Sequence, residues 1–281
     1  MEKRNKKGKG LLILLLSVVL FACTALGALQ LGSVYSHESW EYFFPEYDKV
    51  NLQPILEKNE LTDEDYELLY RQTGLTRLGI DGCLERGQTD RILKIQDFLF
   101  KEQDVIIHKF APFTYMEDID DHATFAILEP GDIIVSSTTS VSWWRYGHAA
   151  LVVDGESGII LESIAPGTNS KLNDASTFDD IRDFLILRPK ADKETKAKVV
   201  QYALQNLVGI PYSLTVGILT PKYAERLKSS QCAHLVWYAY RKFGIDLDST
   251  GGRVVKPSDM ACSPEVELVQ AYGFDLDKLW K

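Results

Sequence analysis

The sequence predicts an α+β protein in which helices pack on a small antiparallel sheet, preceded by an N-terminal membrane helix and a small helical region. Three patterns predict this fold class. Residues 11–29 are uncharged and mostly apolar, residues 62–100 repeat apolar side chains at helical spacing, and residues 127–187 hold short β-rich runs between turns. We therefore expect four regions: a basic cytoplasmic segment (1–10), an anchor or signal segment (11–31), an aromatic wrap with a helical appendage (32–112), and a globular domain (113–281).

The composition is that of an ordinary globular chain with an acidic body. Hydrophobic residues make up 45% and charged residues 25% of the 281 residues, which excludes wholesale disorder and a protein with many membrane spans. The formal net charge is −9, although five of the first ten residues are basic. Binding to phosphate backbones needs a basic face, so we expect no nucleic-acid partner.

The N-terminal apolar run predicts export of the rest of the chain. Residues 11–29 extend about 28 Å as a helix at ~1.5 Å per residue, close to the thickness of a bilayer core. Because the basic flank stays in the cytoplasm, we expect a single-pass cell-membrane protein with its globular domain outside. Two alternatives stay open: secretion after cleavage near 25–27, and a lipoprotein anchored through Cys23, which ends a lipobox-like stretch over 20–23.

Residues 32–112 are expected to form an aromatic wrap followed by a small helical appendage. The wrap is suggested by aromatic side chains that gather around Pro45, namely Trp40, Tyr42, Phe43, Phe44 and Tyr47. Thr62 begins a helix, because residues 62–65 approximate a capping box with acids in the first turn. Gly74 ends this helix, and further helical pieces are expected over 80–84 and 91–100.

The second half of the chain alternates strands and helices. A strand is expected over 133–135, and the runs 148–153 and 159–164 flank a turn, which predicts a β-hairpin. Another strand is expected over 184–187. Two helices then follow, over 191–208 and over 232–243, and Gly244 ends the second.

Cys232 begins the last of these helices, and its position favours a reactive thiol. Helix N-termini stabilise thiolate through the macrodipole and the free N–H groups of the first turn. Apolar residues recur three, four, seven and eleven positions after Cys232. The sulfur therefore points along the helix face that packs on the sheet.

The predicted hairpin offers a base and an orienting acid for this thiol. If its strands pair symmetrically about Gly155, His148 and Glu162 lie directly opposite each other, with Cβ atoms about 4.5 to 5.5 Å apart. A carboxylate beside an imidazole fixes the tautomer of the ring and stabilises its charged form. A slip of one residue would place the two side chains on opposite faces of the sheet.

Five short motifs resemble a known family. They are Gly131-Asp132-Ile133-Ile134, the run from Gly147 to Val153, Glu162, Gly209-Ile210-Pro211-Tyr212, and the run from Gln231 to Val236. In this order, histidine first and cysteine last, they resemble the permuted papain-like amidases of the YaeF/YiiX type, a branch of the NlpC-type cell-wall hydrolase superfamily. The resemblance covers residues 127–270 and implies a circularly permuted papain-like, NlpC-like fold. It implies Cys232 as nucleophile, His148 as base and Glu162 as orienting residue, whereas His234 departs from the family pattern.

The implied reaction is acyl transfer through a cysteine thioester at the cell envelope. The resemblance implies an amide or ester substrate, such as a peptidoglycan peptide or an acylated amine, and no cofactor. The Cys232 N–H is expected to stabilise the oxyanion, with Gln231 or Tyr212 as a second donor. The aromatic run that includes Trp143, Trp144 and Tyr146 precedes His148 and is expected to wall the substrate cleft from at least one side.

Other readings of the same residues stay open or are excluded. The three site residues also suit a lipid acyltransferase or thioesterase, and the cleft also suits an inactive binding module. Cys232 and His234 with His148 leave a tetrahedral zinc site incomplete, so no metal is expected. Cys83 and Cys262 remain as a candidate disulfide outside the cell.

Overall fold

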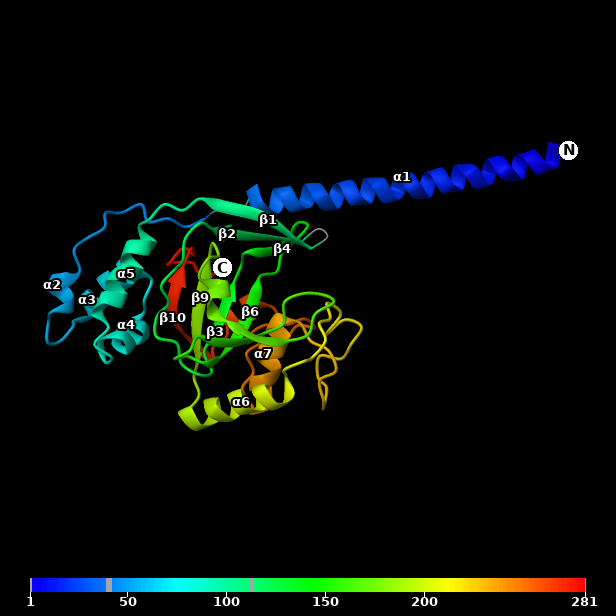
Figure 1. The fold of residues 1–281 in the computed structure, drawn as a ribbon. Coiled ribbons are helices and arrows are strands. Elements are labelled where there is room, and N and C mark those ends of the chain that lie inside the picture. The colour runs from blue at the N-terminus through cyan, green and yellow to red at the C-terminus, as the bar shows by residue number, and fades with distance from the viewer. Residues whose placement is uncertain (1, 39–41, 112–113, 281) are drawn as a thin grey trace.

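The computed structural model describes residues 2–38, 42–111 and 114–280. Within these ranges the strands form two antiparallel sheets, and helices surround them, so the predicted α+β class is confirmed. Figure 1 shows a mixed body from which one long helix projects.

The larger sheet has six strands in the order β10-β9-β3-β6-β7-β8. The expected hairpin and the two other expected strands are present in it, joined by two strands that sequence patterns did not indicate, β8 and β10. The bounds are β3 Ile133–Ser136, β6 His148–Asp154, β7 Ile159–Glu162, β8 Lys171–Asp174, β9 Phe184–Pro189 and β10 Val266–Tyr272.

One face of this sheet is covered by α6 (Lys193–Asn206) and α7 (Cys232–Arg241), with α8 (Pro257–Ala261) beside them. Every residue of α7 from Cys232 to Tyr240 is buried, and its main contacts are with β6. A helix that is apolar all round belongs in a core rather than at a surface. The start of α7, which carries the cysteine, is thereby fixed against the sheet.

The opposite face is covered by α3 (Asp63–Thr73), α4 (Arg77–Leu84) and α5 (Thr89–Leu99), after the short α2 (Gln53–Leu56). The expected capping box at Thr62 is confirmed. These helices share one hydrophobic cluster with the outward side chains of β3, β6 and β7, including Ile134, Val152 and Ile160. They pack on the sheet as its second layer, whereas the sequence suggested an appendage.

A second, four-stranded sheet was not expected. It runs β1-β2-β4-β5, with bounds Val105–Ala111, Thr114–Ile119, Thr139–Val141 and Trp144–Arg145. The fully buried carboxylate of Glu117 on β2 forms ion pairs with Arg145 on β5 and with Arg182. Because β5 leads directly into His148, this sheet fixes the segment that enters the site.

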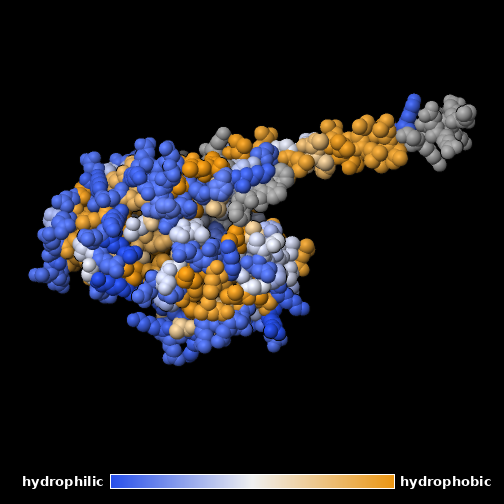
Figure 2. Space-filling view, in the orientation of Figure 1, coloured by the Kyte–Doolittle hydropathy of each residue, from blue (hydrophilic) through white to orange (hydrophobic). Residues whose placement is uncertain are grey.

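The helix α1 (Glu2–Glu38) is long and apolar enough to cross a membrane over Lys9–Ser36. Figure 2 shows its described surface as an apolar rod outside a mostly hydrophilic body. Its last turns contact the body through β4 and β5, and Gln30 donates to the Tyr115 hydroxyl on β2 at 2.5 Å. The finding fits a membrane span or a signal sequence.

The aromatic segment lies against the body where the structure describes it. The Tyr42 hydroxyl donates to that of Tyr272 at 2.6 Å, and Phe43 packs on the core; Trp40 lies outside the described residues. The candidate disulfide is wrong, because Cys83 is a buried free thiol and Cys262 an exposed one.

Candidate active site

The hairpin β6–β7 places His148 and Glu162 together, but in a register two residues from the predicted one. Glu162 pairs with Ala150, and a bulge follows Val152. A shift of two residues preserves the face, so His148 and Glu162 become diagonal neighbours, a spacing that long side chains reach. The expected contact is therefore present although the expected direct pairing is wrong.

Glu162 holds the His148 ring by a short, buried contact. The Nε2 atom of His148 lies 2.8 Å from Oε2 of Glu162, whose side chain is 3% exposed. Asn173 on β8 donates from Nδ2 to the other carboxylate oxygen at 2.7 Å. The imidazole also stacks on Phe178 of the 3-10 helix η1 (Ala175–Phe178), with ring centroids 5.3 Å apart. Ring position and tautomer are thus constrained from three sides.

Cys232 meets the same ring from the helix layer. Burial by itself lowers the pKa of His148, but hydrogen bonds and charge interactions with Cys232 and Glu162 outweigh it and raise the pKa to about 10. Since Nε2 is engaged by Glu162, Nδ1 is the nitrogen left for the sulfur. Burial also raises the pKa of Glu162, but His148 and then Asn173 outweigh it and lower that pKa. The His148 ring therefore holds its proton more firmly than a free imidazole does.

The start of α7 is defined by Gln231. Its Oε1 accepts the Ala233 N–H at 3.0 Å as a helix cap and lies 3.3 Å from the Cys232 sulfur. Its Nε2 donates to the Val255 carbonyl at 2.7 Å. Gln231 therefore holds the cysteine in place, with one of its two amide hydrogens engaged, while the Cys232 N–H has no intrahelical acceptor.

A cavity of about 160 Å³ opens over Cys232 and collects the other expected residues. Trp144, Tyr146, Tyr212 and Gln231 all line it. Burial, followed by the charge of Cys232, raises the pKa of both tyrosines, so both stay neutral hydrogen-bond donors near the sulfur. The remaining walls are mostly apolar: Val141, Leu214, Ile218, Val254, Val255, Lys256 and Pro257. Trp144 supplies the expected aromatic wall, whereas Trp143 lies outside.

His234, the residue that departs from the family pattern, holds the loop before α7 in place. It is buried, its Nδ1 pairs with the Ser230 hydroxyl at 2.9 Å, and its Nε2 lies 2.9 Å from the Lys222 carbonyl. Burial lowers the pKa of His234 to about 4, so the ring is neutral. Both nitrogens are engaged by the loop before α7, which leaves none for a metal beside Cys232.

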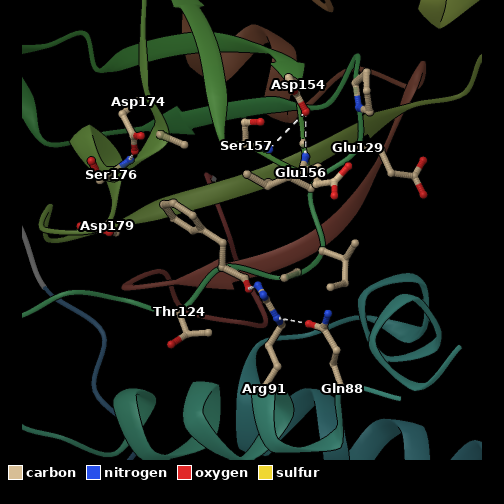
Figure 3. Close-up of a pocket in the computed structure, with 18 of the residues that line it drawn as sticks. Gln88, Arg91, Thr124, Glu129, Asp154, Glu156, Ser157, Asp174, Ser176 and Asp179 are labelled. Atoms are coloured by element: carbon tan, nitrogen blue, oxygen red, sulfur yellow. Dashed lines mark hydrogen bonds between the residues drawn. The ribbon is translucent and has the colours of Figure 1, made fainter. Parts of the chain in front are cut away.

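A second, larger hollow lies at the turn end of the hairpin (Figure 3). It has a volume of about 810 Å³ and is lined by Arg86, Arg91, Glu129, Asp154, Asp174 and Asp179 among others. Several of its side chains have neighbours as partners: Arg91 donates to the Gln88 amide oxygen, and Asp154 and Asp174 accept the N–H groups two residues on. Glu129 and Asp179 instead pair with side chains far along the chain. Cys232, His148 and Glu162 do not line it.

Asn173 and Phe178 complete the site but were not indicated by the sequence. They come from a polar edge strand and a one-turn helix, which carry no periodic signal. Comparison of the chain with protein-family models, curated proteins and solved structures found no match.

Proposed function

We propose that the protein is an exported thiol hydrolase of the amidase or peptidase type, which transfers an acyl group through a thioester on Cys232. The observation that carries the proposal is the contact between Glu162 and His148. Glu162 and Cys232 together raise the pKa of the His148 ring. A nucleophile, a base and an orienting acid in contact are the signature of covalent acyl transfer. The permuted papain-like fold is proposed on the same grounds.

The chemistry follows from the protonation of the pair. The Cys232 thiolate attacks the carbonyl carbon of an amide or ester, and the carbonyl electrons move to oxygen. When the tetrahedral intermediate collapses, the His148 imidazolium gives its proton to the departing amine or alcohol. The neutral His148 ring then takes a proton from a water molecule, whose oxygen bonds to the acyl carbon of the thioester. The carbon–sulfur bond breaks, which releases the carboxylic acid and restores the Cys232 thiolate.

The developing oxyanion has candidate donors within the cavity. The Cys232 N–H lies in the first turn of α7, where the helix dipole favours negative charge. Tyr212 and Tyr146 line the same cavity, and their raised pKa values keep both hydroxyls protonated. The sequence suggested Gln231 or Tyr212 as the second oxyanion donor. We favour Tyr212, because the Gln231 amide group is already bonded to Val255 and Ala233.

The cavity walls favour an apolar acyl group over a hydrophilic peptide. Val141, Leu214, Ile218 and Val254 surround the approach to the sulfur. We therefore place an acylated amine ahead of a peptidoglycan peptide as substrate. The same walls favour a second candidate, a lipid acyltransferase or thioesterase that uses the same three residues.

Trapping the acyl-enzyme tests both candidates. Full-length protein in detergent is incubated with a panel of acylated amines, phospholipids and muropeptides, quenched in acid and weighed by mass spectrometry. The proposal expects a covalent mass increase on the Cys232 peptide, absent from a Cys232→Ser variant and present in a Cys262→Ser control. Equal labelling of Cys232 and the exposed Cys262, or no adduct from any donor, would overturn it in favour of a binding module.

A further inference from the structure

The end of α1 fixes the level at which the body meets a membrane. The apolar residues of α1 from Leu11 onward project free of the body, and the first described contacts lie at Leu29, whose carbonyl accepts the Ser142 hydroxyl at 3.0 Å. Gly32 then lies against Trp143, and Ser36 against Arg145. Because residues 11–29 span about 28 Å, the whole hydrocarbon core of a bilayer, the loop 142–143 falls at the lipid headgroups.

The side chain at this level is one that membrane interfaces favour. Trp143 is 65% exposed although it is among the largest apolar side chains in the chain. Tryptophan concentrates at the headgroup level, where its apolar ring and its N–H are both satisfied. An exposed Trp143 beside the outer end of an apolar helix therefore has a lower free energy at a bilayer interface than in water.

A second apolar feature lies on the same side of the body. Ile218 and Leu219 occupy the tip of a tight turn and are 60% and 82% exposed, where turns normally carry polar residues. The turn has a defined conformation, since the Gly217 N–H donates to the Thr220 carbonyl at 2.7 Å and Gly217 has φ 86°. Gly217 also lies so close to the Arg253 backbone that a Cβ would collide with it. In Figure 1 the loop after α6 (yellow) lies on the side of the body from which α1 projects.

The cavity over Cys232 lies between Trp143 and the 218–219 turn, because a neighbour of each lines it. Trp144, the neighbour of Trp143, and Ile218, the neighbour of Leu219, both line it and are both more than half exposed, as is Leu214. These side chains form its rim. The exposed Arg253 shares a shallow groove with Ile218 and Leu219, which places a cation beside the apolar tip, as a phosphate headgroup would require.

We propose that Trp143, Leu214, Ile218 and Leu219 form a membrane-docking surface that dips into the outer leaflet of the bilayer crossed by α1. The mouth of the Cys232 cavity then opens at the lipid surface, and the body is held by one span and one interfacial contact. Contiguous exposed apolar groups on a soluble body mark an interaction site. The inference rests on α1 being retained, and it does not require Cys232 to be a nucleophile.

Site-directed fluorescence in nanodiscs tests the docking. Full-length protein, one copy per phosphatidylcholine–phosphatidylglycerol disc, carries Cys23→Ser, Cys232→Ser and Cys262→Ser, and a polarity-sensitive dye is attached through Leu219→Cys. Matched controls attach the dye through Leu204→Cys on α6 and Leu172→Cys on β8, which are 41% and 44% exposed. Intact mass first verifies that α1 is present, which separates loss of the anchor from failure to dock.

Docking predicts blue-shifted emission at position 219 and quenching by lipids brominated near the headgroup, with neither effect at 204 or 172. As a check that the dye does not create the contact, Trp143→Phe in the otherwise unlabelled protein removes most of the lipid-quenchable tryptophan emission. Emission at 219 equal to that of the controls overturns the proposal. A blue shift without lipid quenching also overturns it, because the dye is then covered by protein.

Discussion

The two ends of the β6–β7 hairpin carry carboxylates in opposite surroundings. At one end Glu162 is 2% exposed and divides its oxygens between His148 and Asn173. At the turn end Asp154 is partly exposed and accepts the N–H groups of Glu156 and Ser157. The turn end has the larger hollow, about 810 Å³ against about 160 Å³, but its Asp154 and Asp174 carboxylates accept neighbouring backbone N–H groups. The candidate site is thus distinguished from the larger hollow by buried groups whose pKa values depend on each other, and not by its volume.

The largest expected effect is that of Cys232→Ser. Loss of the nucleophile should reduce turnover on the order of 10⁴-fold or more, because the other groups act only through the thioester. Cys262→Ser should retain wild-type turnover, since that thiol is exposed and does not line the Cys232 cavity. Equal losses in both variants would contradict the role assigned to the Cys232 thiol.

Glu162→Gln should come next, with a loss on the order of 10²-fold in turnover. The amide keeps the shape but removes the negative charge that favours imidazolium, so the loss should appear in kcat more than in KM. Asn173→Ala removes one hydrogen bond to the same carboxylate and should cost about tenfold or less. Steady-state kinetics on whichever acyl donor forms the adduct measures both, and a larger loss for Asn173→Ala would contradict the assigned order.

The stability contribution of His148 should depend on pH in one direction. Its pKa rises from 6.5 to about 10 on folding, so the folded state binds the proton more tightly. The free energy of unfolding of wild type minus that of His148→Gln should be constant below about pH 6.5 and decrease as the pH rises through about 10. Denaturant titrations at pH 6, 8 and 10 measure it, and a difference that stays flat or grows over this range rules out the raised pKa.

The smallest effect is expected at the turn end. Asp154→Asn keeps an oxygen that can accept the same two N–H groups, so turnover should be unchanged and the unfolding midpoint almost so. A substantial loss of activity in this variant would make the groove of Figure 3 part of the working site.

Two features could be predicted well from the sequence: the sheet face on which a strand residue lies, and the residues that cap a helix. The alternation of β6 and β7 decides which face His148 and Glu162 share, and Thr62 and Gly74 mark the ends of α3. The exact register escaped prediction, because the bulge after Val152 leaves no pattern. The helix expected over 191–208 is shorter at both ends, since α6 runs from Lys193 to Asn206, and its buried apolar residues are Val199, Val200 and Ala203.

The remaining elements could not be predicted because their signals are long-range. The strand β8 is polar and lies at a sheet edge, so nothing local distinguishes it from a loop, and Asn173 was missed with it. The β1–β2 hairpin exposes Ile106 and Ile107, about half exposed each, which breaks the usual alternation. That α3–α5 cover the sheet follows from a shared core whose members lie far apart in the chain.

The central claim is that Cys232 and Glu162 together hold His148 as an imidazolium. Nitrogen-15 NMR of histidine-labelled, full-length protein tests it directly, because the chain has only five histidines and His148→Gln assigns the signal. At pH 8 both ring nitrogens of His148 should carry protons in the wild type, and Cys232→Ser should lower the pKa of the ring. A neutral His148 ring at pH 8, with one protonated nitrogen, would contradict it.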